Sequence, residues 1–480
     1  MSIFRRKSIA VLQAEAEGET GLKRALGAVN LTMLGIGAII GTGIFVLTGT
    51  VAAQNAGPAV VLSFVLAGIA SVFAALCYSE FAALVPVAGS AYTYGYATLG
   101  EVFAWIIGWD LILEYAFAAS TVAVGWSGYV VSFLSHIGIH VPAQFSGARG
   151  TVVQMADGST VTAIFNLPAV LIIVLVTALL VVGIKESARF NNVIVFVKVG
   201  VILLFVAFAS QAIDPANWQP FIPANTGLRE NFGASGIVAG AGIVFFAYIG
   251  FDAVSTAAQE ARNPQRDMPI GILGSLAICT VLYIVVSAIA TGVVPYQLLD
   301  VPDPIAKVAD AAGLGWMTRL IELGAIAGLS SVILVQLMGQ ARVFWTMSHD
   351  GLLPAFVNKI HPKFRTPYIT QIVLGVAVAI PAGFLTVREA AALVSIGTLL
   401  AFVIVCAAVL LLRVREPHLH RPFKAPFIWF VAPAGIGSCL YLMYFLPLTT
   451  WLRLLVWLAI GIAIYLLYGR THSKLARAAD

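Results

Sequence analysis

Long apolar runs alternate with short polar segments along the whole chain. Each run holds roughly the 20 apolar residues that a helix needs to cross a bilayer. The residues within each run are continuously apolar rather than alternating, which excludes a membrane β-barrel. The twelve runs fall at 29–53, 58–84, 103–134, 166–184, 190–210, 233–258, 270–294, 320–347, 368–386, 389–412, 426–447 and 450–468. The pattern predicts an all-α polytopic membrane protein with 12 transmembrane helices.

The composition excludes several classes of protein. The chain has 480 residues, of which 60% are hydrophobic and only 10% are charged. Soluble domains carry about 25% charged residues, and so few charges could not cover the surface of a soluble globule. A soluble enzyme, a nucleic-acid binder and a disordered chain are therefore excluded. The 4 cysteines lie in apolar runs without metal-ligand spacing, so we expect no metal and no cofactor.

The positive charges predict how the chain is oriented. With 12 spans, both termini lie on one side of the membrane, and the segments on that side hold 20 of the 27 Lys and Arg residues. The opposite side holds 6, and the remaining residue, Lys198, lies inside a span. The excess predicts cytoplasmic termini in the cell membrane. We therefore expect cytoplasmic tails at 1–28 and 469–480 and a single twelve-helix domain at 29–468.

Two of the runs are interrupted. The first contains four glycines in nine residues, between Gly35 and Gly43, which make a poor continuous helix. Close helix packing through a GxxxG pair would explain these glycines equally well. The sixth run, however, is also interrupted, at Gly250 and Asp252, where the aspartate has the form of an N-cap that starts a new half-helix. Interrupted helices at corresponding positions of two halves mark the binding site of many secondary transporters.

The two interruptions suit a zwitterionic ligand. Free N–H groups at the start of a half-helix favour a carboxylate, and free carbonyls at the end of the other favour an ammonium. A further polar residue, Gln336, lies in the middle of the eighth run, where it either faces the cavity or bonds another helix. The predicted substrate-binding residues are Ile40, Gly41, Thr42, Gly43, Phe246, Ala247, Ile249 and Gln336.

Several strings of the sequence resemble a known family. The main ones are GIGAIIGTGIFVLTG at 35–49 and FFAYIGFDAVSTAAQE at 245–260, and PVAGSAYTYGYATLGE, GWDLILEY, ESARFNNVIVFVKV, RNPQRDMPIGI and DGLLP support them in order. The chain resembles the amino acid–polyamine–organocation superfamily, and more narrowly bacterial members of the cationic amino acid transporter family. The resemblance implies uptake or exchange of L-amino acids. It also implies a LeuT-like 5+5 inverted repeat, with helices 1 and 6 broken and two extra C-terminal helices.

Ionisable residues inside the runs suggest how transport is driven. Lys198 lies nine residues beyond Arg189, roughly 13 Å along a helix, which is too deep for easy snorkelling. It is either a structural partner of a carboxylate or a functional group. By resemblance, it occupies the place of a sodium ion in sodium-coupled relatives, near the carbonyls of 35–39. Glu114 either relays protons or positions a neighbour, whereas we expect Asp110 at the membrane interface. We predict proton coupling through Lys198 and Glu114.

The expected function is that of a secondary active transporter, an amino acid permease that works by alternating access. Small neutral L-amino acids are favoured because we expect no acidic side chain to face outward at the second interruption, where it could receive a basic side chain. Cationic amino acids come second and polyamines, which lack a carboxylate, third. An amino acid/polyamine exchanger and a non-transporting sensor are the alternatives. An intramembrane enzyme is disfavoured because no HExxH or GxSxG motif occurs.

The expected partners are a small-molecule L-amino acid, a proton as coupling ion and the lipid bilayer, with no nucleic acid. The sequence does not decide between symport and exchange. It also leaves open whether an accessory membrane subunit is needed.

Overall fold

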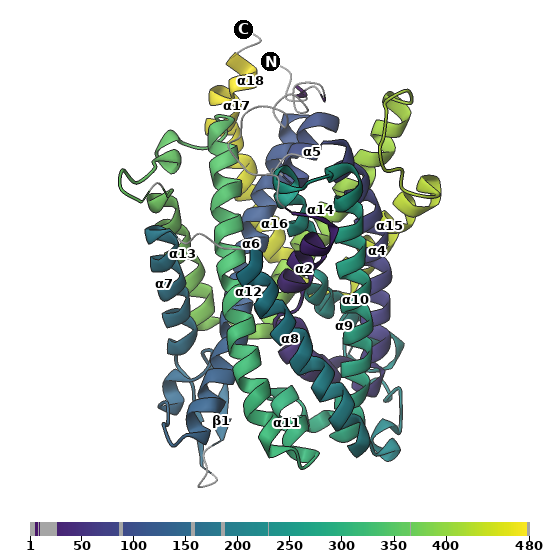
Figure 1. Ribbon diagram of the computed structural model, residues 1–480, viewed down its shortest axis with the longest axis vertical. Helices are drawn as coiled ribbons and strands as arrows, with labels where there is room; N and C mark the ends of the chain where they lie inside the picture. Colours follow the sequence, from purple (N-terminus) through teal and green to yellow (C-terminus); the bar gives the residue numbers. More distant parts are fainter. Residues whose placement is uncertain are drawn as a thin grey trace.

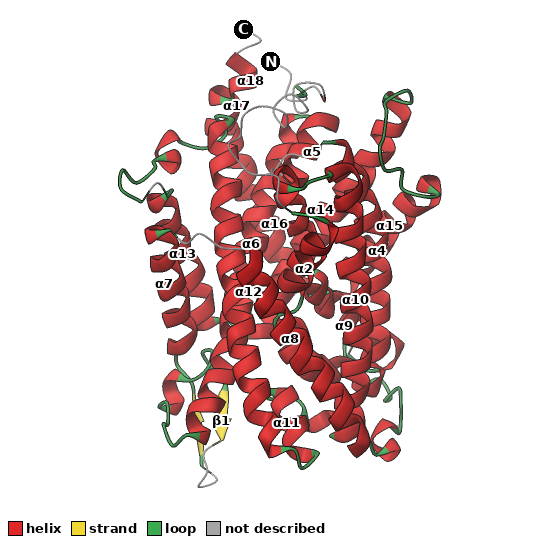
Figure 2. Cartoon of the chain, viewed as in Figure 1, coloured by secondary structure: helices red, strands yellow, loops and turns green. Residues whose placement is uncertain are grey.

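The computed structural model describes residues 5–7, 9, 26–85, 90–154, 159–183, 188–228, 230–364 and 366–477. Most of the predicted N-terminal tail lies outside these residues. The described part is helical, apart from one short hairpin that the sequence did not predict (Figure 2). In this hairpin β1 (Val152–Gln154) pairs antiparallel with β2 (Thr160–Thr162), with Val153 opposite Val161.

Ten of the predicted apolar runs coincide with single long helices. They are α4 (Val60–Leu84), α6 (Glu101–His136), α7 (Leu167–Val182), α8 (Ala188–Ala209), α10 (Pro264–Val293), α12 (Gly315–His349), α13 (Tyr368–Phe384), α14 (Val387–Arg415), α15 (Ile428–Phe445) and α16 (Leu448–Ile464). Shorter helices lie between or after them: α5 (Ser90–Thr98), α11 (Pro304–Ala311), α17 (Arg470–His472) and α18 (Lys474–Arg477).

The first and sixth runs are each divided into several pieces. The first forms α2 (Ala28–Ile39), η1 (Gly43–Leu47), α3 (Thr48–Val51) and η2 (Ala52–Ala56). The sixth forms α9 (Gly233–Val244), η7 (Phe245–Tyr248) and η8 (Asp252–Glu260). The two interruptions predicted from glycine content are therefore present as breaks in the helices.

The helices form a bundle suited to a bilayer. Nine helical stretches of the described residues are long and apolar enough to cross a membrane, and Ala28–Ile39, Leu167–Val182 and Tyr368–Phe384 are shorter apolar helices. Large apolar side chains point outward, for example Val174 on α7, Val376 on α13 and Leu455 on α16, each more than half exposed. Such an apolar exterior would be a liability in water but suits contact with lipid. The protein is a multi-pass membrane protein, and the described termini, residues 5–7 beside α5 and helix α18, lie at the same end of the bundle (Figure 1).

The broken segments lie at the centre of this bundle. Helix α2 packs against α8, α10 and α12, and η7 packs against η1 and α4. Figure 1 shows α2 enclosed by longer helices. Because surrounding helices exclude lipid, unpaired backbone groups at the breaks are tolerable at this depth.

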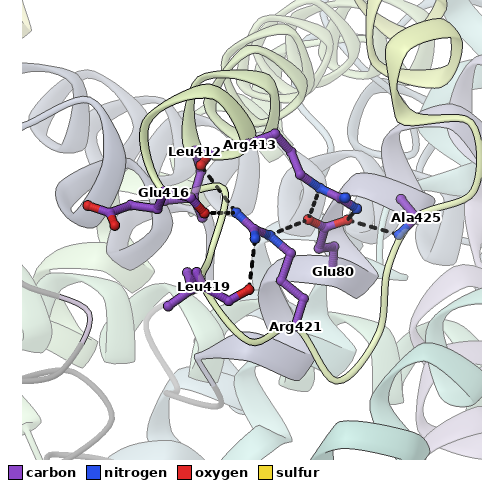
Figure 3. A network of polar contacts seen from close by, with 7 residues as sticks. All are labelled: Glu80, Leu412, Arg413, Glu416, Leu419, Arg421 and Ala425. Carbon is purple, nitrogen blue, oxygen red and sulfur yellow. Dashed lines mark hydrogen bonds and ion pairs between the residues drawn. The ribbon is translucent and has the colours of Figure 1, made fainter.

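A buried ion-pair network joins α4 to α14 at the end that holds the termini (Figure 3). Both oxygens of Glu80 accept hydrogen bonds from the Arg413 guanidinium, at 2.9 and 2.7 Å. Arg421 pairs with the same carboxylate at 3.2 Å and donates to the carbonyls of Leu412 and Glu416. The network satisfies a buried carboxylate and the last carbonyls of α14 together. Glu80 therefore has the structural role that its place at the end of a span suggests.

Candidate functional site

The break in the first run separates two helices with a short extended segment. Helix α2 ends at Ile39, and Ile40 has the extended backbone angles φ −72° and ψ 97°. The helix resumes at Gly43. The first N–H groups of a helix have no carbonyl one turn earlier to bond. The N–H groups around Thr42 and Gly43 are therefore available at the break, and their dipoles favour an anion.

The break in the sixth run has a different geometry. Ile249 is extended, with φ −64° and ψ 134°, and Gly250 follows with a φ of 121° that a side chain would strain. The Asp252 carboxylate accepts a hydrogen bond from the Gly250 N–H at 3.1 Å, at the residue where η8 begins. The aspartate therefore holds the turn between the two half-helices.

The two breaks are in direct contact. A Cβ added at Gly43 would lie 2.5 Å from the Cα of Ala247, and one at Gly250 would lie 2.9 Å from the carbonyl carbon of Ala38. The Tyr283 hydroxyl on α10 lies 2.8 Å from both the Ile39 and the Ala247 carbonyl oxygens. Tyr283 therefore links the two broken helices, a role that the sequence pattern did not indicate.

A narrow cavity lies where the two breaks meet, with a free volume of about 10 Å³, roughly what one water molecule needs. Five of the eight predicted substrate-binding residues line it, namely Gly41, Thr42, Phe246, Ile249 and Gln336. Ile40, Gly43 and Ala247 are not among the lining residues, although they form the backbone directly beside it. The remaining lining residues are Ala38, Ile39, Val122 and Val332.

The cavity holds few polar side chains. The Thr42 hydroxyl is buried and finds no hydrogen-bond partner in the described part of the chain. Gln336 is 5% exposed, and among the described residues its amide makes no hydrogen bond to another helix. All other lining side chains are apolar and none is acidic. A ligand with one polar head group and an apolar remainder matches this lining.

The carbonyls of the second break are less free than the sequence suggested. The Ala247 carbonyl accepts from Tyr283, and the Phe246 carbonyl accepts from the Ile249 N–H at 3.2 Å. We therefore correct the expectation that these carbonyls are unpaired. Because a carbonyl oxygen has two lone pairs, each still has room for one further donor.

Lys198 faces the interior beside the first break. Its side chain is 1% exposed, and its ammonium donates to the Gly37 carbonyl at 3.0 Å and the Ile40 carbonyl at 3.2 Å. Its stem lies against Gly328 of α12. Among the described residues it forms no ion pair with a carboxylate. The cation therefore holds the end of α2 to α8 through backbone groups.

The structure does not bring Glu114 to Lys198. Glu114 is 1% exposed on α6 and lies beside Asp252 and Thr398, away from α8. One turn earlier, Asp110 was expected at the interface, but it is 1% exposed and neither of its carboxylate oxygens has a partner. We correct this expectation: α14 packs against this face of α6, and the carboxylate is buried against Gly397 of α14.

No metal centre competes with this site in the described part of the chain, where no cluster of three or more His, Cys, Asp or Glu side chains could hold a metal ion. The paired breaks, the orphaned hydroxyl and the buried lysine together form the candidate site.

The whole chain is similar to known amino acid permeases and related transporters. The family model for amino acid permeases matches residues 26–466. A branched-chain amino acid permease of Bacillus subtilis is 51% identical over 475 residues, covering 99% of both chains. The methylthioribose transporter of the same organism is 47% identical over 474 residues, again with 99% coverage of both. A vacuolar cationic amino acid transporter of Arabidopsis thaliana is 38% identical over 421 residues, which is 87% of this chain and 68% of the relative.

Proposed function

The chain belongs to the amino acid permease family, within the amino acid–polyamine–organocation superfamily, and we propose that it moves neutral L-amino acids with apolar side chains. It is an amino acid transporter and not an enzyme. The observation that carries the substrate proposal is the cavity between the two breaks, whose lining holds no acidic side chain. A lysine or arginine side chain would find no counter-charge there, whereas an aliphatic one would contact Val122, Val332 and Ile249.

Each end of the substrate has a proposed partner. The carboxylate binds the N–H groups at Gly41 to Gly43 and the free Thr42 hydroxyl, and the ammonium binds carbonyls of 246–249. Two facts support this assignment: the orphaned hydroxyl lies in the cavity, and the dipole of the resumed helix favours an anion there. Gln336 contacts the side chain of the substrate from α12.

We further propose proton coupling in a LeuT-like, twelve-span architecture with both termini cytoplasmic. Dividing the stretch Gly43–Leu84 at Gly57, where φ is 62°, gives a first span from α2 to η2 and a second in α4. In the proposed cycle, the charged Lys198 ammonium holds the end of α2, and α2 is released when this ammonium loses its proton. Glu114, placed beside Asp252 of η8, acts on the other broken helix rather than exchanging a proton directly with Lys198.

The head-group assignment predicts which compounds compete for uptake. Methyl esters and N-acetyl derivatives of a transported amino acid are expected to compete at least tenfold more weakly than the parent, because each lacks one of the two charged groups. The loss of one charge-assisted hydrogen bond is worth about 1.5–3 kcal/mol. Radiolabelled uptake into proteoliposomes with each competitor measures this.

The same assay separates the alternatives. Saturable uptake with counterflow supports a transporter, whereas binding without flux supports a sensor. Methylthioribose is an informative competitor because a relative is named for it and it lacks an amino-acid head group. Equal competition by the methyl ester, or stronger competition by methylthioribose, would contradict the head-group assignment.

Gln336 is expected to control which side chains are accepted. Changing it to Met or Ser alters the size and polarity of the cavity wall without removing any interhelical hydrogen bond found among the described residues. We expect the relative affinities of competing amino acids to change by about 5- to 30-fold, which corresponds to about 1–2 kcal/mol, with protein levels near normal. An unchanged ranking in a destabilised protein would instead show that Gln336 serves helix packing.

A further inference from the structure

A second recess lies far from the substrate cavity, at the end of the bundle that holds the termini. It is bounded by the last turn of α7, the last third of α12 and the start of α13, and has a volume of about 360 Å³. Figure 1 shows α7 and α13 side by side and next to α12. Its polar lining comes from Arg342, Thr346, Thr366 and Gln371.

Three features of this recess favour an anion. Arg342 is exposed and has no acidic partner within 4.0 Å in the described part of the chain. The first turn of α13, a helix of 17 residues, opens onto it through Pro367 and Gln371. The Gln371 amide is 5% exposed, and no hydrogen bond to it is found among the described residues. The two hydroxyls add little as donors, because each already donates to a backbone carbonyl.

The surroundings favour a lipid over a small soluble anion. Leu180 and Met338 line the recess, and Trp345, at 40% exposure, has the place of an aromatic side chain at headgroup level. The adjoining apolar side chains Val182 and Ile372 are 56% and 48% exposed and form the lipid-facing surface below it. By contrast, the groove between α7 and α13 around Val174 and Val376 is almost wholly apolar and would select no headgroup.

We propose that this recess binds the phosphate headgroup of an anionic phospholipid in the leaflet at the termini. The Arg342 guanidinium and the Gln371 amide donate to the phosphate oxygens, and the acyl chains lie against α7 and α13. Basic pockets between transmembrane helices at the cytoplasmic side are suited to such headgroups, so the proposal also uses the orientation given above. Since α12 lines the substrate cavity through Val332 and Gln336, a bound lipid would brace the helix that contacts substrate.

The test measures lipid binding and does not depend on transport. The full chain in neutral detergent is melted with increasing phosphatidylglycerol, phosphatidylcholine or inorganic phosphate. We expect phosphatidylglycerol to raise the melting temperature at concentrations where the other two do not. Arg342→Gln is expected to weaken phosphatidylglycerol binding about fivefold, as the loss of one cationic contact near an anionic surface predicts. Gln371→Leu is expected to weaken it by a similar factor, because one neutral hydrogen bond is worth about 0.5–1.5 kcal/mol. Arg342→Lys is expected to retain part of it.

Arg266→Gln is the matched control, because Arg266 is exposed at the same end of the bundle on α10 and lies outside the recess. It is expected to respond to phosphatidylglycerol like the wild type. An unchanged response of Arg342→Gln would overturn the proposal, and so would equal stabilisation by phosphatidylcholine. Stabilisation by inorganic phosphate alone would also overturn it, by identifying a simple anion site. Because Arg342 is exposed, its substitution is not expected to prevent folding.

Discussion

Replacing Gly43 by valine is expected to abolish substrate binding, with a loss of at least about 100-fold in affinity. A Cβ at this position would lie 2.5 Å from the Cα of Ala247, so the two broken helices would have to separate. The branched side chain would also resist the backbone conformation at the break. Overpacking of this kind costs about 1–3 kcal/mol even where the neighbours can adjust, and here the neighbour is backbone. Binding of a radiolabelled substrate to purified protein measures the loss.

Gly437→Val is the matched control for this change. Gly437 lies in α15, and a Cβ there would meet nothing within 4 Å. The same substitution at that position is expected to leave affinity within about twofold of the wild type, since exposed changes away from special sites alter stability by about 0.5 kcal/mol or less. Binding by Gly43→Val at wild-type affinity would show that the contact between the breaks is not needed for the site.

The sequence predicted the breaks well because their cause is local. Glycine content is a property of short segments, and the helices indeed break at Ile40 and Ile249. The expected N-cap at Asp252 was wrong, because Asp252 is the first residue of η8 and its carboxylate bonds the preceding Gly250 N–H instead. The same holds for the helical runs, whose length and continuity depend only on neighbouring residues. The β1–β2 hairpin was missed because three-residue strands give too short a pattern to recognise.

Features that depend on distant partners were not predictable in the same way. Tyr283 bonds carbonyls 244 and 36 residues away along the chain, and nothing in its own helix indicates this. Asp110 was misjudged because its burial is caused by α14, a helix far along the chain whose Gly397 lies against the carboxylate. The depth of Lys198 in its span marked it as a candidate functional residue, but its two carbonyl partners follow only from the way α2 ends.

Changing Lys198 to methionine is expected to abolish accumulation of substrate against a gradient while leaving a folded protein. The methionine keeps much of the side-chain volume beside Gly328 but removes both hydrogen bonds to the Gly37 and Ile40 carbonyls. Without the ammonium, protonation can no longer control whether α2 is held against α8. One proton per substrate supports about tenfold accumulation per pH unit, because a pH unit is worth about 1.4 kcal/mol. In the mutant, the substrate concentration inside the liposomes is expected to equal that outside, a ratio of about one, because the proton gradient no longer drives uptake.

The decisive measurement compares wild type and Lys198→Met in liposomes with an acidic exterior, with and without sodium. Lys307→Met is the control, because that lysine lies on α11 at the opposite end of the bundle and its ammonium likewise donates to a backbone carbonyl, that of Leu298. It should accumulate substrate like the wild type. Leaving two carbonyls unpaired in Lys198→Met costs about 1–3 kcal/mol each, so its melting temperature should be compared before transport is judged. Sodium-dependent accumulation by the wild type, or undiminished proton-driven accumulation by a folded Lys198→Met protein, would show that Lys198 does not couple transport to protons.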